Sequence, residues 1–264
     1  RRALPAPATA TRLIEFGSDE HVRLWQRFVR RAEPHEKQFG RKTADLFRRQ
    51  RDSVLAKLNG RAKRDTFQDL ADEPFNKAEW TKKFRFELRP VILEILRDAG
   101  NAALDDLALS IAFDVENPLV RRFLEQRAQR FAKEVNATTW DALKAALNEG
   151  IKAGESITEL ADRVEQVMGD RIRSSGETIA RTEVIGASNG GTLLAYEQSD
   201  VVEQKQWLAA LDERTRETHI KAHGQTVDLK EEFKVGAGRG PAPGQIGLAE
   251  EDINCRCTMI AVLK

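Results

Sequence analysis

Apolar residues recur at helical spacing through the first three quarters of the chain, and this pattern limits its fold more than any other feature. The apolar stripes lie at residues 22–29, 39–58, 80–95, 119–131 and 140–147. A repeat of three to four positions places side chains on one face of a helix. No strand-like alternation interrupts the pattern before about residue 200. This part of the chain therefore predicts a helical bundle, an extended helical arm, or both.

The pattern changes after Asp200. Residues 201–208 have the character of a strand, 213–223 of a short helix and 257–263 of a closing strand. Residues 236–247 contain five glycines and two prolines, which predicts a loop. A module of this size cannot bury a large core by itself. We therefore expect it to pack on the preceding helices or to contain a stabilising cross-link such as a bound metal ion.

The predicted fold class is mainly α, with a helical N-terminal region followed by a small C-terminal α+β module. An extended N-terminal segment, a basic helical region, a second helical region and the α+β module are expected at residues 1–17, 18–110, 115–200 and 201–264. Pro90 is expected to kink or end a helix. Thr138 and Thr139 are expected to cap a new one, and Asp212 to cap the short helix of the module.

Charge is distributed unevenly along the chain. The total is 43 Lys and Arg against 42 Asp and Glu, a net charge of +1, which argues neither for nor against an anionic partner. Residues 23–64, however, carry 14 basic and 4 acidic side chains, or +10. This segment is either a solvated helix surface or a contact for an anionic partner. The candidate contact residues are Arg41, Lys42, Arg48, Arg49, Arg51, Arg61, Lys63 and Arg64.

Four residues of the module have the spacing of a metal site. His219 and His223 are four positions apart, so a helix would place both rings on one face. Cys255 and Cys257 are two apart, so a strand would place both thiols on one face. Two nitrogens and two sulfurs suit a tetrahedral structural zinc. The alternative is that the cysteines are buried apolar residues and the histidines make hydrogen bonds.

Catalytic signatures are missing from the sequence. It contains no phosphate-binding loop, dinucleotide fingerprint, nucleophile elbow or His-Glu-x-x-His motif. A Cys255–histidine pair lacks an evident third group to orient the base. With only two cysteines, so close together, we expect no disulfide and a reducing compartment. The sequence therefore predicts a protein that is not an enzyme.

Several polar and aromatic residues are expected to be structural. Arg181 and Glu183 lie two apart in a helical pattern and so point to different sides. This favours a salt bridge between helices, or a cap onto the C-terminal module, over a paired catalytic role. Arg214 and Arg216 are expected to tie the turn that begins at Asp212 to carboxylates elsewhere in the chain. Trp207 is expected in the core of the module.

A series of motifs in order resembles one known family, the phage Mu F-like minor head proteins. The motifs are NPLV at 117–120, GESITELA at 154–161, IARTE at 179–183, Asn189-Gly190-Gly191, Trp207, LDERTR at 211–216, His219, His223-Gly224-Gln225, Phe233, Pro241, Pro243 and NCRC at 254–257. The resemblance covers about residues 115–264, and residues 1–110 carry no motif of the family.

The resemblance implies a minor capsid protein of a tailed phage or prophage that supports head morphogenesis and DNA delivery. The implied partners are the portal protein, the major capsid protein and packaged double-stranded DNA. The implied location is the virion head, with the host cytoplasm during assembly. Relatives often carry Cys at the position of His219 and a final His-x-x-Cys-Arg-Cys, which implies metal binding. No histidine precedes NCRC here, so the implied ligands are His219, His223, Cys255 and Cys257.

Two other functions remain open at this point. The same domain can be reused in an enzyme or toxin, such as a metal-assisted nuclease, and a basic helical domain also suits a cellular nucleic-acid-binding protein. No apolar stretch approaches the roughly 18 residues of a membrane span, so no membrane is expected as a partner. The chain begins at Arg1 rather than Met, which leaves room for residues before it.

Overall fold

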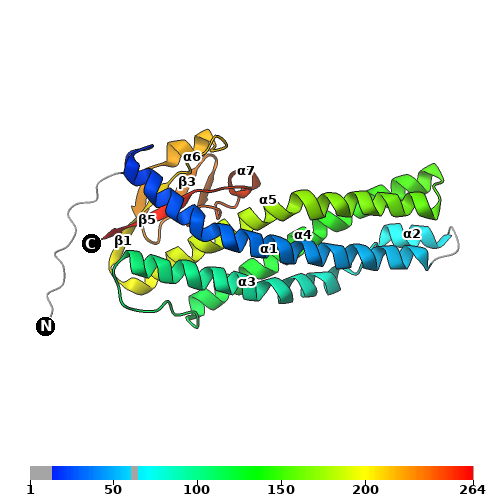
Figure 1. Cartoon of the computed structure of the whole chain (residues 1–264), viewed down its shortest axis with the longest axis horizontal. Coiled ribbons are helices and arrows are strands. Elements are labelled where there is room, and N and C mark those ends of the chain that lie inside the picture. The colour runs from blue at the N-terminus through cyan, green and yellow to red at the C-terminus, as the bar shows by residue number, and fades with distance from the viewer. Residues whose placement is uncertain (1–13, 61–64, 264) are drawn as a thin grey trace. The chain divides into compact units, whose positions relative to one another are not determined.

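Four long helices supply most of the fold (Figure 1). The structure is a computed structural model that describes residues 14–60 and 65–263. The helices of its first three quarters are α1 (Asp19–Asn59), α2 (Asp65–Asp72), α3 (Lys77–Asp106), α4 (Pro118–Ala153) and α5 (Ile157–Ser199). In the described ranges, no helix has both the length and the apolar character needed to cross a bilayer.

The chain forms two compact units that interleave along the sequence. One unit comprises residues 1–33, 95–120 and 185–264, and the other comprises residues 34–94 and 121–184. All four boundaries between these segments therefore fall inside long helices, one each in α1, α3, α4 and α5. Each of the four long helices therefore contributes residues to both units.

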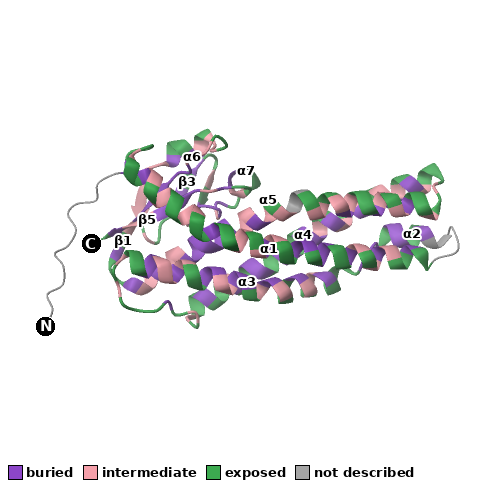
Figure 2. Ribbon diagram, viewed as in Figure 1, coloured by how far each residue is buried: buried purple, intermediate pink, exposed green. Residues whose placement is uncertain are grey.

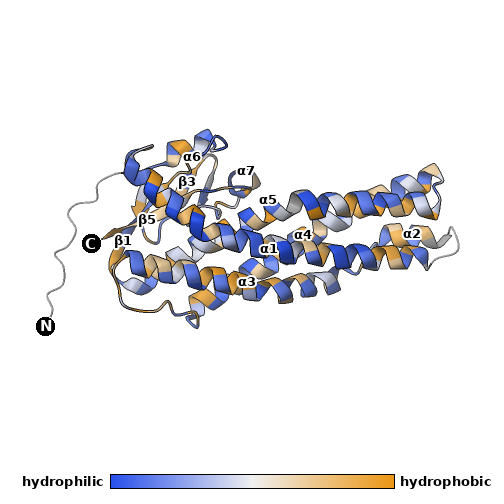
Figure 3. Cartoon of the chain, in the orientation of Figure 1, coloured by the Kyte–Doolittle hydropathy of each residue, from blue (hydrophilic) through white to orange (hydrophobic). Residues whose placement is uncertain are grey.

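The unit of residues 34–94 and 121–184, the helical unit, has an aromatic core; most of its apolar positions are buried and most of its charged positions face outward (Figures 2 and 3). Phe39 and Phe47 of α1, Phe84 of α3 and Phe131 of α4 are buried. The rings of Phe39 and Phe131, and those of Phe47 and Phe84, meet edge to face with centroids 5.4 Å apart. This geometry is favourable for aromatic pairs and joins helices from distant parts of the sequence.

The C-terminal module contains a small antiparallel sheet. Strand β1 (Val202–Leu208) lies between β2 (Thr226–Asp228) and β5 (Thr258–Leu263), and β3 (Phe233–Val235) pairs with β4 (Gly238–Gly240). Short helices α6 (Glu217–Ala222) and α7 (Ala249–Asp252) complete it. The fully buried Trp207 ring meets Phe233 edge to face, with centroids 5.4 Å apart. The predicted fold class, mainly α with a C-terminal α+β module, is confirmed.

Two local predictions were wrong, and a third was wrong in part. Pro90 lies inside α3 and does not end the helix, and Leu88 and Ile92 on either side of it are buried. Thr138 and Thr139 lie inside α4, where each hydroxyl donates to a carbonyl of the preceding turn and so does not cap a new helix. Asp212 accepts from the Arg214 amide at 3.0 Å and so organises a turn, whereas α6 begins only at Glu217.

Gly191 allows α5 to approach α3 closely. A Cβ atom at this position would lie 2.5 Å from the Leu96 carbonyl oxygen. Gly191→Ala is therefore expected to push the helices apart and to lower the free energy of unfolding by about 1–3 kcal/mol. Gly176→Ala is the matched control, because nothing lies within 4 Å of its Cβ position. Urea denaturation should show the control unchanged or stabilised by up to about 1 kcal/mol; equal destabilisation of both variants would contradict the close-packing argument.

Candidate metal centre

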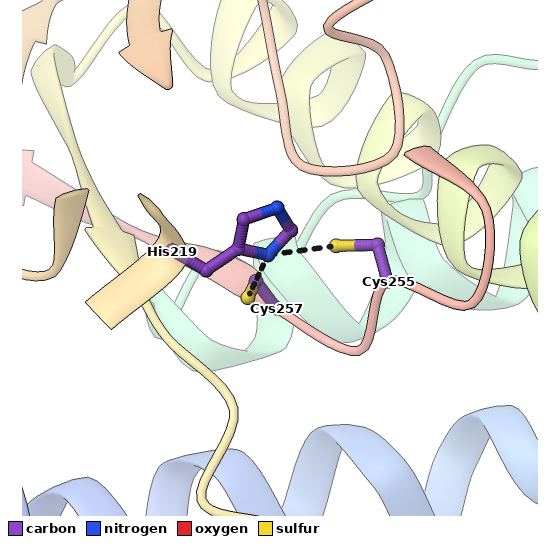
Figure 4. Close-up of side chains that lie close together, drawn as sticks. All are labelled: His219, Cys255 and Cys257. Carbon is purple, nitrogen blue, oxygen red and sulfur yellow. Dashed lines mark hydrogen bonds between the residues drawn. The ribbon is translucent and has the colours of Figure 1, made fainter. Parts of the chain in front are cut away.

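His219, Cys255 and Cys257 meet in the interior of the module (Figure 4). Helix α6 carries His219, and the two cysteines immediately precede β5. The His219 Nδ1 atom lies 3.2 Å from the Cys257 sulfur and 3.8 Å from the Cys255 sulfur. All three residues are at most 2% exposed. One nitrogen and two sulfurs thus converge on a common point.

Glu251 of α7 holds the other side of the His219 ring. Its Oε2 atom lies 3.0 Å from His219 Nε2 and also accepts from the Thr218 hydroxyl at 2.8 Å. The ring is therefore oriented with Nδ1 toward the sulfurs. A carboxylate bonded to the far nitrogen of a histidine ligand is the usual arrangement around protein-bound zinc. Sequence spacing gave no indication of Glu251, because it lies 32 residues from His219.

The electrostatics of this cluster favour a thiolate. The hydrogen bond from Cys257, followed by that from His219, lowers the pKa of Cys255 to about 6. Burial raises the pKa of Cys257. At His219 burial acts to lower the pKa, but the interactions with Cys255 outweigh it and the net shift is upward. Near neutral pH the cluster therefore contains the charged sulfur that a metal ion binds.

The donor set fits zinc in type but not in number. Imidazole nitrogen and thiolate sulfur are the ligands that zinc prefers, and the ring orientation is already fixed by Glu251. The group supplies three ligands, whereas structural zinc takes four. A zinc ion here would take its fourth ligand from outside this group.

His223, the expected fourth ligand, points elsewhere. Helix α6 ends at Ala222, and His223 has φ −55° and ψ 133°, so its ring leaves the helix face that carries His219. Its Nε2 atom lies 2.7 Å from the Ile14 carbonyl oxygen, and its Nδ1 atom accepts from the Ala209 amide at 3.3 Å. The four-ligand set expected from helical spacing therefore does not form in this structure.

The geometry also supplies the third group that a Cys–His pair lacked in the sequence. Cys255, His219 and Glu251 lie in hydrogen-bonding order, as nucleophile, base and orienting carboxylate would. All three are at most 5% exposed, however. Because a substrate bond must reach the sulfur, this burial disfavours nucleophilic catalysis and favours a structural centre.

Asn189 of α5 connects the long helix to the segment that carries the cysteines and to the start of β5. Its side-chain amide donates to the carbonyls of Pro243 and Cys257 at 3.1 and 3.0 Å, and its oxygen accepts from the Thr258 hydroxyl at 2.9 Å. Asn189 is fully buried, so these bonds satisfy the amide without water. The module is thereby fixed to α5 beside the candidate centre.

The other motif residues have structural contacts. Glu183 pairs with Arg127 of α4 at 3.0 Å, and Arg181 lies 3.8 Å from Glu36 of α1. Asp212 pairs with Arg256 at 3.1 Å. Arg214 is exposed, and its amide completes the Asp212 turn. Arg127 was not found from sequence, because nothing distinguishes it from the other arginines of α4.

The basic candidates differ in how far their charge is neutralised. Arg49 pairs with Asp45 and Glu87, and Arg51 with Asp52 and Glu165. Arg41, Lys42 and Arg48 are exposed and have no ion pair among the residues described. Arg61, Lys63 and Arg64 lie outside the described residues, as does most of the predicted extended segment 1–17.

Comparison with known proteins places the candidate centre within a known domain. A family model described as phage Mu protein F like protein matches residues 141–260. This part of the chain, just under half of its 264 residues, is therefore similar to the phage Mu protein F like family. The match includes Asn189, Glu183, Glu251 and all three residues of the cluster, and it confirms the resemblance found in the sequence.

Two curated proteins share the Mu F-like region. The minor head protein GP7 of Bacillus phage SPP1 is 36% identical over 152 residues, which are 56% of this chain and 48% of GP7. The NAD(+)–arginine ADP-ribosyltransferase EFV of Enterococcus faecalis (strain ATCC 700802 / V583) is 30% identical over 152 residues, 56% of this chain and 30% of that protein. The chain thus spans at most about half the length of these relatives. No solved structure matches.

Proposed function

We propose that this chain is a minor head protein of a tailed phage or prophage. The observation that carries the proposal is the combination of the Mu F-like region with 36% identity to a minor head protein. The buried, multiply bonded cluster of the module adds support, because it suits a structural centre better than a site that must admit substrate.

The proposed partners are the portal protein and the major capsid protein. The long helices offer exposed charged faces along most of their length, as a protein that contacts several neighbours in an assembly requires. The proposed location is the virion head near the portal vertex, after a cytoplasmic stage during assembly. We also propose that the chain supports head morphogenesis and DNA delivery.

Within this function, His219, Cys255 and Cys257 would hold a structural zinc ion. The ion would tie α6 to the start of β5 and so staple a module with a small core of its own. Glu251 would fix the tautomer and orientation of His219.

The exposed basic residues of α1 are proposed to contact packaged DNA without sequence preference. Replacing Arg41, Lys42 and Arg48 with Gln is expected to reduce the slope of log K against log salt concentration by about 2.7, or about 0.9 per lost phosphate contact. The measurement is a filter-binding titration on double-stranded DNA at several salt concentrations. The matched control replaces the exposed Arg130, Lys133 and Lys152 of α4 with Gln, which removes the same charge. An equal change of slope in both variants would refute a contact localised on α1.

A second candidate function comes from the name of one relative, an arginine ADP-ribosyltransferase. The match covers only 30% of that protein, so the shared region need not carry its activity. A metal-assisted nuclease built on the same domain is the third candidate. Incubation with NAD⁺ and an arginine substrate, and separately with plasmid DNA and a divalent metal, tests both; turnover in either assay would favour that enzyme over the structural role.

Co-sedimentation with heads tests the proposed function. Lysates of a phage or induced prophage that encodes the chain are separated on a density gradient and probed with an antibody against the chain. Sedimentation with empty and filled heads is the expected result. A protein found only in the soluble fraction at the top of the gradient would overturn the proposal.

A further inference from the structure

Two histidines outside the metal cluster hold the segment that precedes α1 against the C-terminal module. His21 lies in the first turn of α1, and His223 follows α6. Ile14, the first described residue of this segment, is buried, and its amide donates to the Gln206 side chain at 3.5 Å. All of these residues belong to one compact unit.

Hydrogen bonds fix the same tautomer in both rings. The His21 Nδ1 atom accepts from the Gly17 amide at 3.0 Å, so its Nε2 carries the proton and donates to the Ala209 carbonyl at 2.8 Å. The His223 Nδ1 atom accepts from the Ala209 amide at 3.3 Å, so its Nε2 donates to the Ile14 carbonyl at 2.7 Å. An amide N–H can only donate, so each arrangement requires a neutral imidazole.

The two rings also contact each other. Their centroids are 4.4 Å apart with an interplanar angle of 27°, and Phe16 meets both rings edge-on at 5.3 Å. Burial lowers the pKa of His21, and the charge of a protonated His223 lowers it further. Burial also lowers the pKa of His223. A proton added to either ring would place a new N–H against a backbone N–H and would leave the stacked pair charged.

Among the residues that the structure describes, no carboxylate forms an ion pair that would offset that charge. The charged side chains on the elements around the pair are Glu15 of the segment, Asp19 and Glu20 of α1, Glu217 and Lys221 of α6, and Asp212, Glu213 and Arg214 of the loop after β1. Asp212 is engaged by Arg256, and the others are exposed. Within the described chain, none of these carboxylates forms an ion pair with either ring.

We propose that His21 and His223 form a pH-sensitive latch, which holds residues 14–17 and the start of α1 on the module at neutral pH and releases them on acidification. This device goes beyond the proposed function and does not depend on it. Its direction follows from proton linkage. The closed rings resist protonation, whereas the released rings regain the ordinary histidine pKa of about 6.5, so the open form binds more protons as the pH falls below that value. Because two rings can each take up one proton, the ratio of open to closed molecules increases by at most about 100-fold for each pH unit of acidification.

Hydrogen exchange at the two latch amides tests the proposal. The protection factors of the Gly17 and Ala209 amides, corrected for the chemical exchange rate, are measured at pH 7.5 and pH 5.5. We expect both to fall by at least about tenfold at the lower pH, while the Trp207 amide, which is bonded to the Gln225 carbonyl, keeps its protection. Unchanged protection at Gly17 and Ala209, or an equal loss at Trp207, would overturn the proposal.

Two variants test whether the latch histidines, and not His35, cause the pH response. The double variant His21→Gln/His223→Gln cannot be protonated and is expected to lose the pH response, whereas His35→Gln retains it. A pH response that persists in the double variant would overturn the proposal. Nitrogen chemical shifts of the unmodified protein give a test that needs no variant: at pH 7.5 both rings should carry the proton on Nε2, and a proton on Nδ1 of either ring would contradict the latch.

Discussion

His219→Gln is expected to abolish zinc binding by the purified protein, whereas His223→Gln leaves it at close to one equivalent per chain. Only the first ring faces the sulfurs of Cys255 and Cys257, while the second is bonded to Ile14 and Ala209. Loss of a structural zinc is costly, because the free energy of metal binding is also free energy of folding. The module is therefore expected to unfold in the His219 variant at temperatures where the unmodified protein is stable.

Metal analysis and hydrogen exchange measure the two parts of this prediction. The zinc content of each protein is determined after extensive dialysis, and exchange is followed in β1 and β5 of the module and in the helices of residues 34–94. Cys257→Ser should behave like His219→Gln. Zinc retained by His219→Gln, or lost equally from His223→Gln, would contradict the three-ligand cluster. If the unmodified protein bound no zinc, the three residues would form a hydrogen-bonded part of the core and not a metal site.

Arg127→Met is expected to lower the free energy of unfolding of the helical unit by about 3–5 kcal/mol. The Arg127 side chain is 3% exposed; it pairs with Glu183 at 3.0 Å and donates to the carbonyls of Thr182 and Glu183. Removing the guanidinium leaves the carboxylate of Glu183, which is 12% exposed, without its cation. Urea denaturation followed by circular dichroism measures the loss.

Two further variants separate the buried pair from charge in general. In Arg127→Met/Glu183→Leu both charges are gone, so most of the lost stability should return. Arg89→Met breaks the exposed pair with Glu125 between α3 and α4 and should cost no more than about 1 kcal/mol. If the double variant were as unstable as Arg127→Met, the stabilisation would come from packing of the arginine and not from its charge.

The helical part of the fold was predictable because most of the apolar residues that repeat at helical spacing in the sequence are residues that the helices bury. The stripes around Phe39, Phe84 and Phe131 repeat over many turns, and the structure buries those residues. Helix ends were less predictable, because they depend on tertiary contacts. Pro90 and Thr139 are typical of helix boundaries, yet both lie inside long helices whose flanking residues are buried.

Only part of the candidate centre could be predicted. Cys255 and Cys257 are close in sequence, so their convergence required only a local extended backbone. His223 was expected beside His219, but the helix ends one residue too early for its ring to face the same way. Glu251 and Arg127 act through contacts made across 32 and 56 residues respectively, and no local pattern encodes such contacts.

Quantitative peptide mass spectrometry of purified particles tests the central claim most directly. Peptides of this chain are counted against those of the portal protein in empty procapsids and in mature heads of the source phage or induced prophage. We predict a fixed, low ratio to portal in purified heads, as expected of a minor head protein. Absence from both kinds of particle would contradict the account.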